Sequence, residues 1–382
     1  MHFPRGQALE TQCEAQVAAI AAAGPQIEFY DNEVPAFVEA ELERLYECVM
    51  TTVARFAIYE AAPHASTYVV REAGRITTLF LFRREGSRVQ VYNEQMPVAA
   101  QDINRFADAV FARYRKVRLI SFYAISTKAD AIRYPLQLVE CLEDIRMPLP
   151  ASGEAYMTSL GKNTRAAMRR ALRQIQNDHP SFRVQAFERG EASEQLVRQI
   201  IAFNRSRMTE KGQVSCHTEQ DVERLLRLVQ KYGVVVAATI ESRICGGAIS
   251  FRVGSTYHLY VLAHDSRYNA YQLGKLCCYF SVCDAIERGD RQYHFGWGRY
   301  DYKFKLLGRM TVLHRVDLYR SRLQMMAGAA RVAQVAAGAM RRRFKQRIAD
   351  AELGESPADR WILNTAQALR APRQLLARMR GR

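Results

Sequence analysis

The stretch YNAYQLGKLCCYFSVCDAIERG, residues 268–289, changes from a polar loop into a helix, and the change falls at Gly274 and Lys275. A lysine is unfavourable in the first turn of a helix, because that end already carries partial positive charge. The free N–H groups of such an end attract anions. We therefore expect Gln272, Leu273, Gly274 and Lys275 to hold a negatively charged group. A tight strand-to-helix turn would also account for a single glycine.

The composition is that of a soluble globular protein, with 25% charged and 48% hydrophobic residues. A chain of 382 residues is long enough for two domains with sizeable cores. No run approaches ~20 apolar residues, and the N-terminus lacks a convincing secretory signal. The eight cysteines show no C-x-x-C pairs at zinc-like spacing. We expect buried, reduced thiols, no metal site and a cytoplasmic protein.

The positive charge is concentrated in the C-terminal part of the chain. Residues 1–150 hold 16 Lys and Arg against 19 Asp and Glu, so the net charge of +16 resides entirely beyond residue 150. This part is expected to face an acidic partner: nucleotide phosphates, an acidic carrier protein, tRNA or anionic lipid headgroups. Charge alone does not distinguish these partners.

Residues 1–150 predict an α+β domain. Helical periodicity at 34–50 is followed by strand-like runs, a helix at about 101–115 and another strand. The stretch MPLPASG, 147–153, is typical of a linker.

Residues 151–321 predict a second α+β domain, with three short antiparallel strands between 233 and 264. A helix at about 273–288, a strand at 292–298 and a last strand at 312–321 follow. The strand–helix–strand order implies one parallel crossover in an otherwise antiparallel sheet. The alternation in RYDYKFKLL, 299–307, indicates a half-buried strand.

Residues 322–382 are helical in composition and basic, with 13 Lys and Arg against 4 Asp and Glu. Low hydrophobicity favours a helical extension that packs on the preceding domain. Peripheral membrane contact through this tail is the alternative.

Four pieces carry a resemblance to a known family: LPASGEAYMTSLGKNTRAAMRRALR (149–173), LAHDSRYNAYQLGKL (262–276), the expected helix that runs to IERG (286–289), and FGWGRYDYKFKLLG (295–308). Their order resembles the GNAT acyltransferase superfamily. It is most similar to the cellulose-biosynthesis-associated (CelD-type) branch, which is related to the Fem-type peptidyltransferases. The resemblance implies a mixed, mostly antiparallel sheet flanked by helices, with the N-terminal domain as a degenerate second copy. The first glycine of the superfamily's Gly-x-Gly loop is absent, since Gln272-Leu273-Gly274 stands there.

The resemblance also implies a donor site. Acyl-CoA, in particular acetyl-CoA, would set its pyrophosphate on Gln272–Lys275, and its pantetheine arm would enter where strands 256–264 and 292–298 diverge. A Tyr-Lys pair occupies the place of Tyr302 and Lys303 in related sequences. Tyr302 would protonate the departing thiolate, and Lys303 would hold a phosphate or developing negative charge.

Further candidates come from the residue types themselves. His258 and His264 lie on the strand expected to border the cleft, and histidine is the side chain that titrates nearest neutrality. A partly exposed sheet face would also account for them. Arg165 and Arg169 belong to a basic stripe on one helix, which could receive an anionic acceptor or be merely solvated.

The leading hypothesis is an acyl-CoA-dependent N-acyltransferase that acts on an amine or a sugar hydroxyl in cell-envelope or exopolysaccharide biosynthesis. Acyl transfer from acyl carrier protein is one alternative. Fem-like aminoacyl transfer from tRNA is a second, disfavoured one, and a non-catalytic binding subunit is a third.

Overall fold

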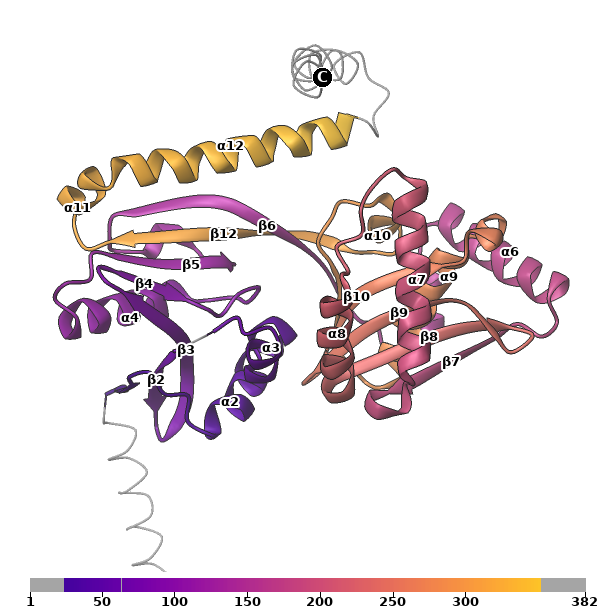
Figure 1. Ribbon diagram of the computed structural model, residues 1–382, viewed down its shortest axis with the longest axis horizontal. Coiled ribbons are helices and arrows are strands. Elements are labelled where there is room, and N and C mark those ends of the chain that lie inside the picture. Colours follow the sequence, from indigo (N-terminus) through magenta and orange to yellow (C-terminus); the bar gives the residue numbers. More distant parts are fainter. Residues whose placement is uncertain (1–23, 63, 352–382) are drawn as a thin grey trace, which may run out of the picture.

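The computed structural model describes residues 24–62 and 64–351, and within them twelve strands form one continuous sheet (Figure 1). The spatial order is β1-β2-β3-β4-β5-β12-β6-β11-β10-β9-β8-β7. The strands are β1 (Gln26–Tyr30), β2 (Ser66–Glu72), β3 (Arg75–Glu85), β4 (Arg88–Val91), β5 (Leu119–Ile125), β6 (Leu136–Pro148), β7 (Arg183–Glu188), β8 (Gly233–Ile240), β9 (Arg243–Val253), β10 (Thr256–His264), β11 (Gln292–Gly296) and β12 (Arg309–Tyr319).

Helices cover the sheet in two lobes. The N-terminal lobe has α2 (Phe37–Tyr46), α3 (Val53–Ile58) and α4 (Ala100–Arg113). The C-terminal lobe has α5 (Gly153–Ser159), α6 (Lys162–Asp178), α7 (Glu194–Glu210), α8 (Glu219–Tyr232), α9 (Leu273–Glu287) and α10 (Asp301–Lys305), and α11 (Arg322–Ala327) and α12 (Ala329–Ala351) follow β12. Short 3₁₀ turns are η1 (Val49–Thr51), η2 (Ala129–Ala131), η3 (Arg189–Glu191) and η4 (Ser266–Tyr271).

The two lobes repeat one strand pattern. In each, antiparallel strands lead into a parallel pair joined by a crossover helix, β4–α4–β5 in the first lobe and β10–α9–β11 in the second. The other strand pairs that form the sheet are antiparallel. The prediction of an α+β fold with a mixed, mostly antiparallel sheet is confirmed, including the parallel crossover.

The lobes are joined by an exchange of strands. β6 follows β5 in sequence yet pairs with β11 of the second lobe, and β12 follows β11 yet pairs with β5 of the first. β6 and β12 also pair antiparallel with each other from Arg309↔Arg146 to Leu318↔Leu136, with one irregularity after Leu313. The sheet therefore has no edge between the lobes.

A polar contact adds to this join. Glu47, which follows α2, accepts hydrogen bonds at Oε2 from the N–H and hydroxyl of Ser255 at 3.0 and 2.7 Å. Its Oε1 accepts from Arg291 at 2.8 Å. A side chain of the first lobe thereby fixes the turn between β9 and β10 in the second.

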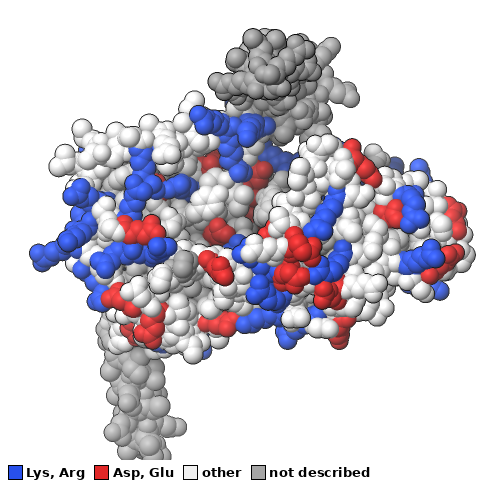
Figure 2. Space-filling model, in the orientation of Figure 1, with Lys and Arg blue, Asp and Glu red and all other residues white. Residues whose placement is uncertain are grey.

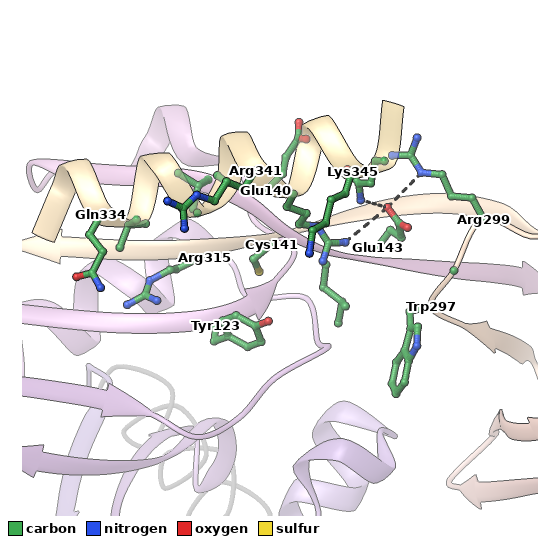
Figure 3. A pocket seen from close by; sticks show the side chains of 18 of the residues that line it. Tyr123, Glu140, Cys141, Glu143, Trp297, Arg299, Arg315, Gln334, Arg341 and Lys345 are labelled. Carbon is green, nitrogen blue, oxygen red and sulfur yellow. Dashed lines mark hydrogen bonds and ion pairs between the residues drawn. The ribbon is translucent and has the colours of Figure 1, made fainter. Parts of the chain in front are cut away.

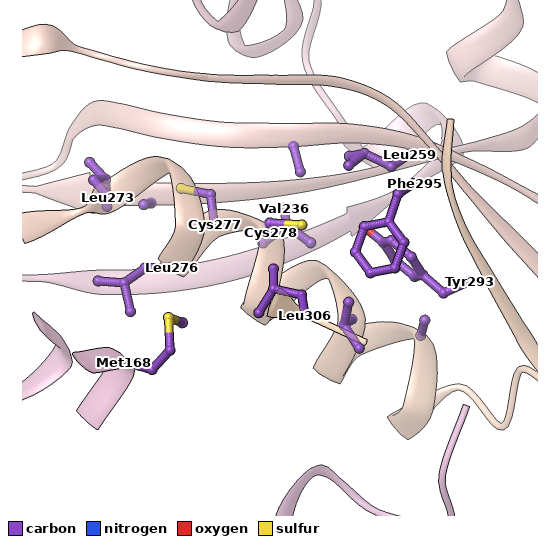
Figure 4. Close-up of a cluster of buried hydrophobic side chains, with 14 of the residues drawn as sticks. Met168, Val236, Leu259, Leu273, Leu276, Cys277, Cys278, Tyr293, Phe295 and Leu306 are labelled. Atoms are coloured by element: carbon purple, nitrogen blue, oxygen red, sulfur yellow. The ribbon is translucent and has the colours of Figure 1, made fainter. Parts of the chain in front are cut away.

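The core of the second lobe lies between α9 and the sheet (Figure 4). Leu273, Leu276, Cys277 and Cys278 of α9 are buried against Tyr293 and Phe295 of β11, among others. α9 is apolar on nearly all sides, because α6 covers the side that faces away from the sheet.

The prediction of a strand at 299–307 is wrong. The segment forms the short helix α10, and an ion pair joins Asp301 to Lys305, one helical turn apart, at 2.7 Å. The buried positions are Lys303 and Leu306, so the burial pattern has a helical spacing, although the letters alternate.

α11 and α12 lie along β6 and β12 on the outside of the molecule (Figure 1). Gln137 of β6 donates to the carbonyl of Val332 at 2.8 Å, and Arg331 lies 3.6 Å from the buried Asp317 of β12. The remainder of the predicted basic tail, 352–382, lies outside the described residues. Among the helices of the described segments, none combines the length and the apolar character needed to cross a bilayer.

Gly308 gives a test of the joint between α10 and β12. A Cβ there would lie 2.5 Å from Ile145 Cγ2 and 2.8 Å from the Lys303 carbonyl oxygen. We expect Gly308→Ala to lower the free energy of unfolding by about 2 kcal/mol in chemical denaturation. Gly338→Ala is the control, because nothing lies within 4 Å of that position. It should raise the stability by about 1 kcal/mol as an alanine within a helix. Equal effects would refute the proposed clash.

Candidate functional site

Two strands separate at the centre of the second lobe. β10 and β11 pair in parallel only from Thr256↔Gln292 to His258↔His294. Beyond that point β10 is irregular between Leu259 and Val261, and β11 ends at Gly296, which has a φ of 69°. The backbone of β10 after His258 therefore has no strand partner on its β11 side.

The loop after β10 presents a helix N-terminus with free donors. Gln272 has the left-handed φ of 51° and precedes α9. Within the described chain, the N–H groups of Leu273 and Gly274 have no hydrogen-bond acceptor. Lys275 Nζ donates to Gln272 Oε1 at 2.9 Å, and this neutral amide is the ammonium's one polar partner among residues 24–62 and 64–351. The geometry is that of an anion-binding helix end.

A cavity of about 230 Å³, called here the small cavity, adjoins this helix end. It brings together three predicted residues, Gln272, Lys275 and Tyr302. The rest of its lining comes from α6 and the α10 segment: Asn163, Thr164, Ala167, Met168, Lys305 and Leu306. The α6 positions were not predicted, because they belong to an amphipathic helix without a distinguishing motif.

Gly274 also leaves room for a neighbouring side chain. A Cβ on Gly274 would lie 2.8 Å from His264 Nδ1, so the missing side chain makes room for this imidazole. His264 Nε2 lies 2.8 Å from Asn269 Oδ1. His264 lines another cavity, of about 350 Å³, together with Arg207 and Glu210. The structure thus places His264 behind the helix end and outside the small cavity.

Tyr302 and Lys303 point in different directions. Tyr302 reaches the small cavity, and burial raises the pKa of its phenol above the ordinary value, so it keeps its proton. Lys303 is 3% exposed and lines neither this cavity nor the cleft described below. Its Nζ donates to the carbonyls of Gly296 at 3.2 Å and Trp297 at 2.6 Å. Lys303 therefore holds the end of β11 in place.

His258 belongs to a buried network between the lobes. Its Nε2 lies 3.0 Å from the Glu47 carbonyl oxygen, and its ring contacts that of His294 at a tilt of 52°, with centroids 4.4 Å apart. Burial and His294 lower the pKa of His258 to about 3, so it is neutral near pH 7. His294 Nδ1 lies 3.0 Å from Asp144 Oδ2, which also accepts from Arg146. His258 lines neither the small cavity nor the cavity that His264 lines.

Arg165 and Arg169 lie on α6 beside the residues that line the small cavity, but they do not line it. The Arg165 guanidinium donates to the Thr158 carbonyl at 2.6 Å, and Arg169 is exposed. Their proposed contact with an anionic acceptor stays a prediction.

A larger cleft, of about 1060 Å³, lies between α12, strands β6 and β12, and the loop after β11 (Figure 3). Three partly exposed aromatic side chains line it, Tyr123, Trp297 and Tyr300. Its charged residues are mostly basic: Arg299, Arg315, Arg331, Arg341, Arg342 and Lys345 against Glu140 and Glu143. This large cleft was not predicted, because its walls come from three segments far apart in sequence.

The environment of Lys303 predicts a pH dependence of stability. Burial lowers its pKa to about 8 in the folded protein, against about 10.4 in an unfolded chain. Between these values the unfolded state binds more protons, so the free energy of unfolding rises with pH. The wild type should therefore gain up to about 3 kcal/mol relative to Lys303→Met from pH 8 to 10.5. Denaturant titrations over this range measure the difference. Lys305→Met, which removes an exposed lysine of the same helix, should show no such gain; a flat difference for Lys303→Met would contradict the assignment.

Comparisons with known proteins agree with this geometry. Residues 162–304 match the family described as acetyltransferase (GNAT) domain. The structure titled "Crystal structure of FemX" aligns at TM-score 0.58 and 9% identity over 80% of this chain and 99% of that one. A conserved protein of unknown function from Bacteroides thetaiotaomicron aligns at TM-score 0.51 and 10% identity over 77% of this chain and 100% of that one. No curated protein matches the sequence. Residues 162–304 are therefore similar to the GNAT acetyltransferase domain, and the two-lobed fold is similar to that of the FemX structure.

Proposed function

We propose that the protein is an N-acyltransferase that moves an acyl group from acyl-CoA to an amine, with a sugar hydroxyl as the alternative acceptor. One observation carries the proposal. Lys275 and Tyr302 line one cavity beside a helix end whose first N–H groups are unpaired within the described residues, in a segment that matches the GNAT domain.

The donor would bind at the small cavity. Its pyrophosphate would accept hydrogen bonds from Leu273 and Gly274 and would replace Gln272 as the partner of Lys275. At about 230 Å³ the cavity is smaller than most ligand pockets, so it suits a narrow chain such as pantetheine. This chain would lie along the unpaired backbone of β10 in the manner of an added strand.

The acceptor would approach from the opposite side. Trp297 and Tyr300 face the large cleft, and Tyr302 and Lys305 line the small cavity. One short segment, 297–306, therefore separates the two spaces, and Lys303 fixes its start. Donor and acceptor could meet across this segment without sharing an entrance.

The chemistry is a direct transfer. The amine nitrogen attacks the thioester carbonyl carbon, the C–S bond breaks, and the departing sulfur takes the Tyr302 proton and leaves as a thiol. The proton that the new amide nitrogen loses then restores the Tyr302 phenol. A main-chain N–H of β10 beyond the irregularity would stabilise the negative oxygen of the tetrahedral intermediate. Lys303 acts here as a positioning residue, because its ammonium is bonded to two carbonyls.

The excess of arginine and lysine in the large cleft favours an acceptor that carries negative charge as well as its nucleophile. An intermediate of cell-envelope or exopolysaccharide biosynthesis would meet this requirement. Arg165 and Arg169 would assist at the rim, on the side of α6.

Donor binding can be tested with two neighbouring alanines of α6. Acetyl-CoA at about a hundredfold excess over its Kd should raise the melting temperature of the wild type by about 3 °C or more. Ala167→Trp should abolish this shift, because Ala167 lines the small cavity and an indole would fill it. Ala166→Trp is the matched control, since Ala166 is exposed and outside the cavity, and it should retain the shift.

The same assay separates the alternative donors. A shift produced by acylated carrier protein and not by acetyl-CoA would identify the carrier protein as the donor. A shift produced only by aminoacyl-tRNA would identify the tRNA as the donor. No shift with any of the three would favour a binding subunit without catalysis.

Tyr302→Phe tests the proton donor. We expect thiol release from acetyl-CoA, followed with a thiol reagent across a panel of amines, to fall by about a hundredfold. The acetyl-CoA-induced thermal shift should persist, because the phenyl ring still fills its place. Wild-type turnover in Tyr302→Phe would exclude Tyr302 as the acid.

A further inference from the structure

The outward side of the two C-terminal helices carries an apolar stripe. Leu323 and Met326 of α11 and Met340 and Phe344 of α12 are 72%, 73%, 69% and 46% exposed. Exposed alanines at 330, 333 and 337 continue the row between them. The spacing from 323 to 344 alternates between three and four residues, which places these side chains along one side of a helical path. We call these seven residues the C-terminal stripe.

The stripe is not needed for packing. The opposite side of α12 makes the contacts to the sheet, through Val332, Arg331 and Gln346, which reach Gln137, Asp317 and Glu143. Large exposed hydrophobic side chains in a row are unusual on a surface that meets only water.

Basic residues flank the stripe. The sequence holds no Asp or Glu between Asp317 and Asp350, and this interval includes exposed Arg322, Arg341, Arg343, Lys345 and Arg347. Figure 2 shows Lys and Arg gathered over the C-terminal half of α12. Arg343 has an acidic partner, Glu140, and Arg341 and Lys345 also line the large cleft. Arg322 and Arg347 lie outside this cleft and have no acidic partner within the described residues.

We propose that the C-terminal stripe docks the protein on an anionic lipid bilayer. Met340, Phe344, Leu323 and Met326 enter the boundary between headgroups and acyl chains. The exposed Arg322, Arg343 and Arg347, which do not line the large cleft, contact lipid phosphates. The helix lies in the plane of the interface and does not cross it.

Charge argues against two other occupants. A second copy of the chain would bring the same unbalanced arginines against themselves. Residues 352–382 contain six arginines and three acidic residues, so they repel this surface as well. An anionic bilayer supplies negative charge for the flanking basic residues and an apolar phase in which the side chains of the stripe can be buried.

Vesicle flotation of the full chain tests the proposal. The wild type should float with vesicles of equal parts phosphatidylglycerol and phosphatidylcholine, should bind phosphatidylcholine alone about tenfold or more weakly, and should be released by high salt. Met340→Ser combined with Phe344→Ser should weaken binding by about tenfold without changing any charge. Val214→Ser is the matched control, because Val214 is 97% exposed and lies outside the stripe, between α7 and α8.

Several results would overturn docking on lipid. One is that the wild type binds the vesicles with phosphatidylglycerol no more strongly than those of phosphatidylcholine alone. Another is that the double variant binds as strongly as the wild type. A concentration-dependent dimer that the double variant dissolves, seen by sedimentation without vesicles, would assign the stripe to a second copy. A melting temperature lowered in the double variant would assign it to residues 352–382. The proposal does not rest on the donor chemistry, since the acetyl-CoA thermal shift should be the same in the double variant.

Discussion

The antiparallel pairing of β6 with β12 is the constraint on which the rest of the structure depends. Each strand leaves its own lobe and completes the sheet of the other, with β6 next to β11 and β12 next to β5. The lobes therefore share a continuous hydrogen-bonded backbone, and their relative orientation is set by strand twist and register. A hinge at residue 150 would be incompatible with this arrangement.

The positions of the small cavity and the large cleft follow from that pairing. Because β6 occupies one side of β11, the other side of β11 can separate from β10 without leaving the strand unsupported. The segment after β11 then turns back through α10, with Lys303 buried beneath it, to begin β12. The small cavity lies on one side of this segment and the large cleft on the other. Two polar contacts fix the same region: Asp144 of β6 pairs with His294 of β11, and Glu47 of the first lobe accepts from Ser255.

Sequence reasoning found what local pattern determines. The helix at 273–288 and its parallel crossover follow from elements adjacent in the chain, whereas Tyr302 was singled out by the family resemblance. It failed where the residue pattern fits two structures. Polar and apolar residues alternate in RYDYKFKLL as in a strand, and only the burial of Lys303 and Leu306 reveals the helix. It also could not anticipate the irregularity after Leu259, which separates His258 in the network between the lobes from His264 behind the helix end. The large cleft joins residues 123, 297 and 342, a long-range arrangement that no local period encodes.

The exchanged strands also bear on how the chain acquires its structure during synthesis. β5 is complete once residue 125 has been made, yet its neighbour β12 is not available until residue 319. During synthesis, the edge of β5 in the first lobe therefore stays unpaired until the chain of the second lobe has been made. An unpaired strand edge is prone to mispairing and aggregation. Contacts so distant in sequence slow the final step of folding. For the same reason, neither half expressed alone would have a complete sheet, and the ribosome-bound chain is a natural client for chaperones that shield unpaired edges.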